Sequence, residues 1–145
     1  AEGAGDEGMS KLFHLEMITP ERRFFDGQVE AVQLPAPDGL MGILAGHEPS
    51  VISLDVGQVR LLYDGEWHEC AASPGFVEIR SDGVVMFSQA FEWPEEIDIS
   101  RALAAKELAE RHIKNQKSRE EYLVNKVSLA RAMVRLETGR KRINH

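Results

Sequence analysis

The sequence changes character abruptly at Trp93 and Pro94. Residues 97–138 contain neither Pro nor Gly and are rich in Ala, Leu, Glu, Lys and Arg, a composition typical of helices. Residues 13–91, by contrast, consist of short apolar and polar alternations separated by turn residues, a pattern typical of strands. The 145 residues therefore predict an all-β body followed by a helical segment, and leave no room for two large domains.

Four Asp-Gly dipeptides punctuate the β segment, each near or between apolar runs. They begin at Asp26, Asp38, Asp64 and Asp82. This dipeptide suits the positive φ angles of tight hairpin turns. Strand alternation is clearest in residues 13–17, 29–34 and 58–63. We expect residues 11–94 to form antiparallel strands with one buried face each, closed into a sandwich or flattened barrel.

Residues 95–145 predict an antiparallel hairpin of two helices. Asp98 or Ser100 is suited to cap the first helix, and Ser118 with Glu121 matches the reciprocal capping box at the start of the second. Small or apolar side chains at three- and four-residue spacing give each helix one stripe. The stripes are Ala102, Ala105, Ala109 and Ile113, then Leu123, Val127, Ala130 and Val134. Gly139 predicts the end of the second helix, before a basic tail of Arg140, Lys141 and Arg142.

Such a hairpin buries little apolar area by itself, and isolated helices of this length are marginal in water. It must therefore pack on the β body, on another subunit, or on each in turn, and the last arrangement is a conformational switch. The charge is divided at the same place: residues 1–95 carry 5 basic and 17 acidic side chains, and residues 96–145 carry 12 and 7. An acidic body with a basic helical segment indicates two surfaces with different partners, and argues against nucleic acid or anionic lipid on the body.

Composition also bears on location. No window approaches eighteen consecutive apolar residues, so no helix is expected to span a membrane. Residues 1–10 lack the basic and apolar regions of a secretion signal and are interpreted as an appended leader or a disordered N-terminus. The single cysteine, Cys70, cannot form an intrachain disulfide and favours a reducing compartment.

No enzyme signature is found. Gly39, Gly42 and Gly46 open no helix and precede no Lys-Ser or Lys-Thr pair, so they do not indicate a phosphate-binding loop. The five histidines never have the spacing that brings two imidazoles to one metal, which argues against a metal site. Ser73 and Ser88 lack the flanking glycines of a nucleophile elbow. We expect no catalytic residues and no required cofactor.

The first of two candidate sites lies in residues 39–49, where Leu40 and Met41 stand beside a predicted turn. One interpretation is an apolar docking tip, with glycines that allow close approach of another backbone. The other is a strand from which Met41 and Ile43 point into the core. We favour the inward position for Ile43 and leave both interpretations open for Leu40.

The second candidate site pairs Arg131 with Arg135, which lie four residues apart and so on one helix face, where like charges repel. An anion would offset that repulsion, and arginine forks bind phosphate. In an antiparallel hairpin, Asp98 and Arg101 would lie beside them. The alternative, which spacing alone favours, is a salt-bridge network of Asp98, Arg101 and Glu137.

The order of these features resembles one family, the epsilon subunit of rotary F-type ATP synthases, which corresponds to the subunit called delta in mitochondria. The likeness covers residues 13–136. Its most specific part is residues 39–49 with Leu54 and Gly57, which is similar to the family's pattern of Gly, Ile, Gly-His, Pro and a downstream Gly, although Ala45 stands where relatives commonly have Pro. Two shorter stretches resemble the family's first hairpin and its Gly-aromatic strand entry. These are Phe25-Asp26-Gly27 and Ser73-Pro74-Gly75-Phe76.

The resemblance implies a β-sandwich of about ten strands followed by the helical hairpin. It also implies a non-catalytic part of the rotor that binds the gamma subunit and the polar loops of the c ring. Carried over by position, the c-ring contact loop is Asp38, Gly39, Leu40 and Met41, and His47 lies in the stretch close to gamma and that ring. The protein would be peripheral on the cytoplasmic face of a bacterial plasma membrane, rather than on an organellar inner or thylakoid membrane.

For the hairpin, the resemblance implies regulation. In relatives it switches between a compact form on the body and an extended form that reaches up the gamma shaft and resists ATP hydrolysis. Basic side chains would then meet acidic loops of the catalytic beta subunits. In this chain they are Arg131, Arg135, Arg140, Lys141 and Arg142.

Some bacterial relatives bind ATP in the compact form through a motif that residues 97–102 resemble at every defined position. The implied ATP-binding residues are Glu92, Ile97, Asp98, Arg101, Arg131 and Arg135. Leu108 departs from the pattern, because those relatives have another Arg there. We hypothesise that ATP, as a regulatory ligand, ties the two helices together and favours the compact form, since a ligand shifts the population toward the state that it binds better.

Two interpretations from other functional classes stay open. The chain could be a free-standing interaction module that binds an acidic protein or nucleic acid through residues 131–142, although the helical segment lacks the interleaved aromatics that stack on bases. It could also be a small hydrolase, which steady nucleotide turnover by the purified chain would show.

Overall fold

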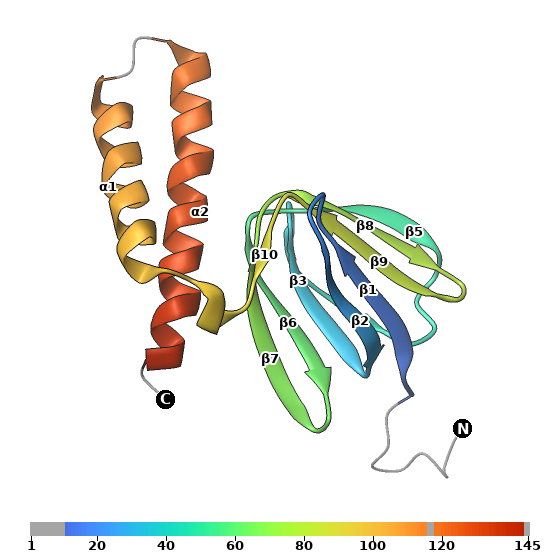
Figure 1. Cartoon of the computed structure of the whole chain (residues 1–145). Coiled ribbons are helices and arrows are strands. Elements are labelled where there is room, and N and C mark those ends of the chain that lie inside the picture. Colours follow the sequence, from blue (N-terminus) through green and yellow to red (C-terminus); the bar gives the residue numbers. More distant parts are fainter. Residues whose placement is uncertain (1–10, 116–117, 144–145) are drawn as a thin grey trace.

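Ten strands form two five-stranded sheets in the computed structural model, which describes residues 11–115 and 118–143 (Figure 1). One sheet has the order β2-β1-β9-β8-β5 and the other β10-β7-β6-β3-β4. The first consists of β1 (Phe13–Ile18), β2 (Arg23–Val29), β5 (Ser50–Leu54), β8 (Gly75–Arg80) and β9 (Gly83–Ser88). The second consists of β3 (Ala31–Ala36), β4 (Gly39–Leu44), β6 (Gly57–Tyr63), β7 (Glu66–Ala72) and β10 (Phe91–Glu92). Neighbouring strands are antiparallel except for the parallel pair β1 and β9, so the predicted sandwich of about ten strands is confirmed.

The core lies between the two sheets and follows the predicted alternation. Leu15 and Met17 of β1 are fully buried, while His14 and Glu16 between them are partly exposed. The same period of two places apolar side chains from both sheets in one cluster. Its fully buried members include Val32, Leu34, Ile43, Val59, Leu61, Cys70, Val77 and Met86. This continuous apolar contact gives the sandwich a fixed shape.

Three of the four Asp-Gly dipeptides lie at hairpin turns as predicted, and one does not. Asp64 and Gly65 have φ angles of 54° and 75° between β6 and β7, which is the geometry that favours this pair. The prediction for Asp26 was wrong, because Asp26 and Gly27 lie inside β2 opposite Glu16 and Leu15. The turn before β2 is closed instead by Thr19, whose hydroxyl accepts hydrogen bonds from the backbone N–H groups of Glu21 and Arg22.

The helical segment forms the predicted antiparallel hairpin beside the β7–β10 edge of the sandwich (Figure 1). It comprises α1 (Ile99–Asn115) and α2 (Arg119–Ile143), preceded by a short 3-10 turn, η2 (Pro94–Glu96). Of the two candidate caps of α1, Asp98 is the one used: its Oδ1 accepts a hydrogen bond from the Arg101 N–H at 3.1 Å. Ser118 caps α2 in the same way, through the Glu121 N–H at 3.1 Å.

The stripe predicted for α2 is not the stripe that is buried. Leu123 and Val127 are 48% and 42% exposed, whereas Ala132 and Leu136 are buried. On α1, Ala102 and Ala109 are buried as predicted but Ala105 is exposed. The second helix therefore carries apolar side chains on two faces, and the compact hairpin buries the face that was not predicted.

The prediction that Gly139 ends the second helix was wrong, because α2 continues to Ile143. Gly139 is buried, and a Cβ atom placed on it would lie 3.1 Å from Ile97 Cγ2. Close approach to the linker, rather than helix termination, explains the glycine. Arg140 is exposed on the last turns of α2. The predicted tail side chains of Lys141 and Arg142, and the predicted leader at residues 1–10, lie outside the described part of the chain.

Gly75 provides a sharp test of the sandwich. A Cβ atom on Gly75 would lie 1.8 Å from the Phe87 carbonyl oxygen, so Gly75→Ala must displace backbone and is expected to lower the free energy of unfolding by about 3 kcal/mol. Urea titration followed by tryptophan fluorescence measures this. Gly42→Ala is the matched control, because Gly42 has open space around its Cβ position and should stay within about 0.5 kcal/mol of the parent. Equal losses in the two variants would contradict the close approach of Gly75 to Phe87.

Candidate functional site

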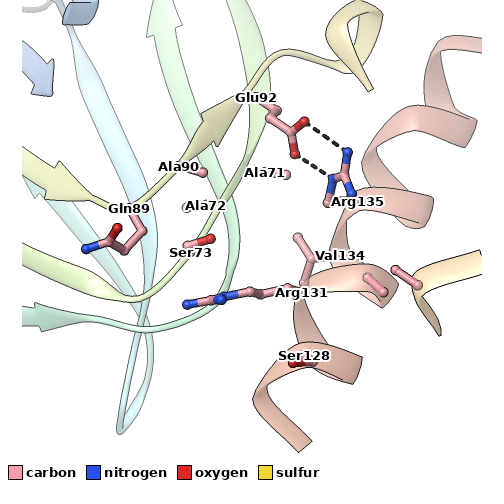
Figure 2. A pocket seen from close by; sticks show the side chains of 12 residues that line it. Ala71, Ala72, Ser73, Gln89, Ala90, Glu92, Ser128, Arg131, Val134 and Arg135 are labelled. Atoms are coloured by element: carbon pink, nitrogen blue, oxygen red, sulfur yellow. Dashed lines mark hydrogen bonds and ion pairs between the residues drawn. The ribbon is translucent and has the colours of Figure 1, made fainter. Parts of the chain in front are cut away.

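A cleft of about 420 Å³ separates the C-terminal half of α2 from the β7–β10 edge of the sandwich (Figure 2). Most of the side chains along it are small, so its walls are smooth and mainly apolar. The sandwich contributes Ala71, Ala72, Ser73, Gln89, Ala90 and Glu92. The hairpin contributes Ala105, Ser128, Arg131, Ala132, Val134 and Arg135. Both arginines of the second candidate site therefore line a single space.

Arg135 is held by Glu92 across this cleft. Its Nε lies 2.6 Å from Glu92 Oε1 and its Nη2 lies 3.2 Å from Oε2, a two-pronged ion pair between α2 and β10 (Figure 2). The two side chains are 29% and 25% exposed, so the pair is partly shielded from water. This ion pair offsets the repulsion expected between Arg131 and Arg135.

Arg131 lies one helical turn away and extends toward the sandwich wall of the cleft near Ser73 (Figure 2). Within residues 11–115 and 118–143, its guanidinium makes no ion pair or hydrogen bond to another side chain. A cationic group with five donors thus faces a small-residue wall while its neighbouring cation is already neutralised. The cleft therefore presents one uncompensated positive charge.

The structure places the other implied ATP-binding residues beside the cleft rather than in its wall. Ile97 is buried at 3% exposure, and Asp98 is occupied as the cap of α1. Arg101 is exposed and does not line the cleft. Leu108 is 47% exposed and does not line the cleft. Of the six residues, Glu92, Arg131 and Arg135 are brought together.

The alternative salt-bridge network does not form among the described residues. The carboxylate of Asp98 receives a backbone N–H, Glu137 is exposed, and neither pairs with Arg101. Spacing along the helices favoured that network because it compares only residues of the helices. It could not indicate a partner for Arg135 in the sandwich, and Glu92 lies 43 residues earlier in the sequence. The anion that balances the arginine pair comes from the sandwich.

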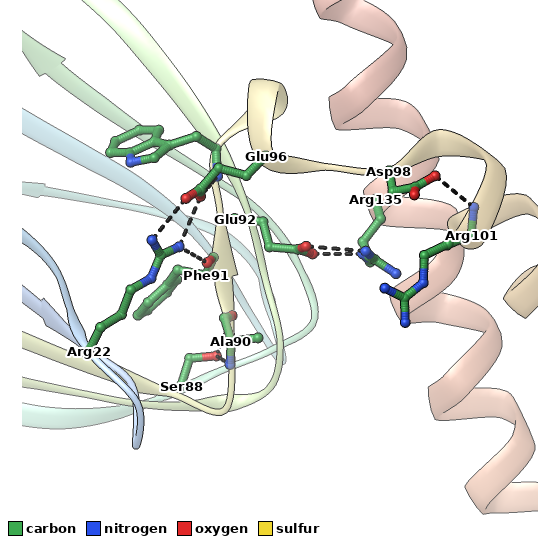
Figure 3. A network of polar contacts seen from close by, with 10 residues as sticks. Arg22, Ser88, Ala90, Phe91, Glu92, Glu96, Asp98, Arg101 and Arg135 are labelled. Atoms are coloured by element: carbon green, nitrogen blue, oxygen red, sulfur yellow. Dashed lines mark hydrogen bonds and ion pairs between the residues drawn. The ribbon is translucent and has the colours of Figure 1, made fainter.

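A second ion pair, which the sequence analysis missed, fixes the linker before the hairpin. Arg22 contacts Glu96 through Nη1 at 2.8 Å and Nη2 at 2.9 Å, and its Nη2 also donates to the Phe91 carbonyl (Figure 3). Glu96 further accepts the Trp93 N–H at 2.8 Å. The hydrogen bond from Arg22 holds the pKa of Glu96 below its usual value, and the same bond raises the pKa of Arg22. Residues 74 apart in sequence carry no local signal of such a pair.

The first candidate site lies at the turn between β3 and β4. Leu40 is 71% exposed, so of the two interpretations left open for it, the docking tip fits the structure. Ile43 is fully buried, as predicted, and Met41 is partly buried against the core. His47 follows β4, so a six-residue strand separates it from Asp38. The structure thus groups residues 38–41 at one tip but does not bring His47 to them.

An exposed aromatic pair on the first sheet was not singled out as a site. Phe76 is 47% exposed and stacks on Phe87 with ring centroids 4.7 Å apart. Together with Ile18, Pro20 and Pro74 they line a shallow depression of about 390 Å³. The sequence does indicate this exposed position. Phe76 precedes the buried Val77, and neighbouring side chains of a strand point to opposite faces, so Phe76 lies on the outer face of β8.

The described residues offer little for other chemistry. No three His, Cys, Asp or Glu side chains among them are grouped as a metal site would require. Cys70 is fully buried, and burial raises the pKa of its thiol far above the usual value. No helix in the part of the chain that the structure describes has the length and apolar content to cross a membrane.

Comparisons with known proteins agree across the chain. Residues 12–94 match the family model of the ATP synthase delta/epsilon chain β-sandwich domain, and residues 95–139 match that of its long α-helix domain. The ATP synthase epsilon chain of Caldanaerobacter subterraneus is 45% identical over 92% of this chain and 97% of its own length. That of Ruminiclostridium cellulolyticum is 45% identical over 90% and 97%.

A solved structure shares the fold. A chain in the mitochondrial ATP synthase of Euglena gracilis, in a complex of OSCP, F1 and c-ring, superposes with a TM-score of 0.73 at 21% identity, covering 92% of this chain and 82% of that one. With family models that together span most of the residues and relatives at 45% identity, the resemblance noted in the sequence is confirmed. The chain belongs to the ATP synthase delta/epsilon chain family.

Proposed function

We propose that this protein is the epsilon subunit of a bacterial F-type ATP synthase, a non-catalytic part of the central stalk whose hairpin regulates ATP hydrolysis. Family membership and full-length bacterial relatives support the assignment. The observation that carries the regulatory part is how the hairpin is attached. Ion-paired and hydrogen-bonded side chains, Arg135 with Glu92 and Thr138 with Gln58, join α2 to the sandwich beside an open cleft. Contacts of this kind are individually modest and reversible.

The sandwich is the part that couples the rotor. Its exposed Leu40 tip supports a contact with the polar loops of the c ring, and the outward Phe76 on another face supports a contact with the gamma subunit. Both surfaces stand on strands with a fully buried core between them, so they keep their relative position under load. Through these partners the protein would be peripheral on the cytoplasmic face of a bacterial plasma membrane.

The hairpin is the part that moves. Its second helix exposes a stripe that includes Leu123 and Val127, while a different face packs in the compact form. That stripe is available to a new partner when α2 leaves the sandwich. The excess of basic side chains in residues 96–145 complements acidic loops of the catalytic beta subunits, with Arg131, Arg135 and Arg140 in the second helix.

ATP is the proposed regulatory ligand of the cleft, with no cofactor required. The unpaired guanidinium of Arg131 suits a phosphate group, and the alanine-lined walls suit a flat ring. A ligand between α2 and the sandwich contacts both, so it favours the compact form. Leu108 limits the affinity relative to a site with one more arginine.

Isothermal calorimetry of the purified chain tests the ligand. We expect saturable ATP binding that Arg131→Ala weakens about tenfold, because a charge-assisted contact to phosphate is lost. Arg111→Ala is the matched control: it removes the same charge from an exposed position of the hairpin outside the cleft and should leave binding unchanged. Absence of binding at high ATP would remove the ligand and leave the stalk assignment standing.

The regulatory role is tested in the assembled complex. A chain that ends after Glu96 keeps every strand, the core contact of Trp93 and the Arg22–Glu96 pair, so it should still couple the rotor while ATP hydrolysis by the complex rises several-fold. Steady-state hydrolysis and proton-driven synthesis are measured side by side. Hydrolysis that stays at the level of the complete complex would show that the hairpin does not restrain it.

A charged substitution at Leu40 tests the docking tip. Leu40→Glu should lower the affinity of the protein for a gamma–c-ring complex about tenfold, since it removes the apolar side chain at the tip and adds a charge that must lose water on binding. Val124→Glu is the matched control, because Val124 is 65% exposed, close to the 71% of Leu40, but lies on the hairpin. Surface-immobilised complex provides the measurement, and an equal effect of the two variants would contradict a role of the tip.

The other two interpretations predict different results. An interaction module for nucleic acid would show binding that falls steeply with salt and depends on Arg131, Arg135 and Arg140. A hydrolase would turn over ATP without other subunits. Neither result is expected of a central-stalk subunit.

A further inference from the structure

Gly139 occupies an unusual place in α2. It lies in the interior of a 25-residue helix, four residues before the end, and it is buried. A glycine in a helix interior disfavours the helix relative to alanine by a factor of about five in the equilibrium constant. Such a residue is retained where a side chain would not fit, and here the space is taken by the linker before α1.

Two isoleucines approach Gly139, Ile97 from the linker and Ile99 from the first residue of α1. A Cβ atom added to Gly139 would lie 3.1 Å from Ile97 Cγ2 and 3.3 Å from Ile99 Cγ1, both tighter than ordinary contact. These are branched side chains with little freedom to rotate away. Ile97 is 3% exposed, so almost none of its side chain borders solvent. The position of residue 139 therefore accommodates glycine, whereas the methyl group of an alanine would crowd both isoleucines.

Ile97 belongs to the sandwich side of this contact. Its N–H donates to the Pro94 carbonyl at 3.2 Å, which closes η2, and the preceding residue is Glu96. Glu96 is fixed to the sandwich by the two-pronged ion pair with Arg22. A displacement of α2 from the sandwich therefore separates Gly139 from a side chain that stays in place.

The neighbours of Gly139 are the other attachment points of α2. Thr138 is fully buried, and its hydroxyl accepts a hydrogen bond from Gln58 Nε2 at 2.9 Å. Arg135, one turn earlier, pairs with Glu92. All three contacts lie in the last turns of α2, where the helix meets η2, β6 and β7.

We propose that the Ile97–Gly139 contact is the packing element that sets how firmly the hairpin is held in the compact form. This rests on the proposed function, in which the hairpin leaves the sandwich. The missing side chain permits close packing when α2 is docked, and no such contact exists when α2 is free. An added methyl group crowds Ile97 only in the docked form, so Gly139→Ala favours release.

The test uses the full chain with spin labels at two exposed positions, Glu66 on β7 and Val124 on α2, each replaced by cysteine. Cys70 is fully buried and does not take a label. Double electron–electron resonance gives the docked and released fractions. Gly139→Ala should raise the released-to-docked ratio by about fivefold or more, because the added methyl group overpacks the contact only in the docked form.

Three further variants make the result specific. Glu137→Ala, at an exposed position two residues earlier, should leave the ratio near that of the parent. Ile97→Ala added to Gly139→Ala removes the 3.1 Å contact with Cγ2 and leaves contacts of 3.3 Å with Ile99 Cγ1 and 3.4 Å with the Cβ of residue 97, so it should restore part of the docked fraction. Glu92→Gln breaks the ion pair of Arg135 and should release the hairpin without involving Gly139.

The outcomes distinguish the role of the Ile97–Gly139 contact from the mobility of the hairpin. If Glu92→Gln releases the hairpin and Gly139→Ala does not, the proposed role of Gly139 is wrong while the mobile hairpin stands. If neither variant changes the distances, the mobile hairpin itself is contradicted. Release by Gly139→Ala without any recovery in the double variant would also overturn the assignment to Ile97.

Discussion

The hairpin depends on one small contact, the meeting of the last turns of α2 with the linker and the β7–β10 edge. Two helices packed through alanines cannot bury enough apolar area to be stable alone, so this contact decides where they lie. It consists of the ion pair of Arg135 with Glu92, the hydrogen bond of Thr138 with Gln58, and the packing of Ile97 against Gly139. Polar contacts of this type each contribute on the order of 1 kcal/mol, so the sum is small enough to be shifted by a ligand or a partner.

The sandwich, unlike the hairpin, is held together by extensive apolar contact. Its fully buried apolar cluster joins both sheets, and the Arg22–Glu96 ion pair extends the rigid part to the start of the hairpin. Under the proposed function, the boundary between the part that stays in place and the part that moves lies after Glu96, close to Ile97 and Asp98. This division matches the division of charge, since the sandwich part is acidic and the helical part is basic.

Local patterns predicted the fold well because local chemistry decides most of it. Period-two alternation gave the core positions of β1, and Ser118 gave the start of α2 through its own hydrogen bond. Predictions were wrong where a residue distant in the sequence determines the local structure. Gly139 lies inside α2, where its lack of a side chain makes room for Ile97, and Asp26 did not form a turn because Thr19 closes that hairpin earlier in the sequence.

The candidate site was less predictable for the same reason. Helical spacing placed Arg131 and Arg135 on one face, and both line the cleft. It could not show that Glu92 of β10 would pair with Arg135, or that Asp98 would be occupied as a cap. The resemblance to the family added Glu92 because it supplies residues by position, whereas periodicity compares only neighbours within one helix.

The pairing of Arg135 has a consequence for any anion in the cleft. Such a ligand gains attraction from Arg131 at once, but it must compete with the carboxylate of Glu92 for Arg135. Modest affinity is sufficient for control, because a ligand present at about 100 times its Kd stabilises the state that binds it by about 2.7 kcal/mol. That is comparable to two or three of the polar contacts that dock α2. A cellular nucleotide at high concentration would therefore govern a weakly held hairpin without a tight site, and the absence of an arginine at Leu108 would tune the concentration at which it does so.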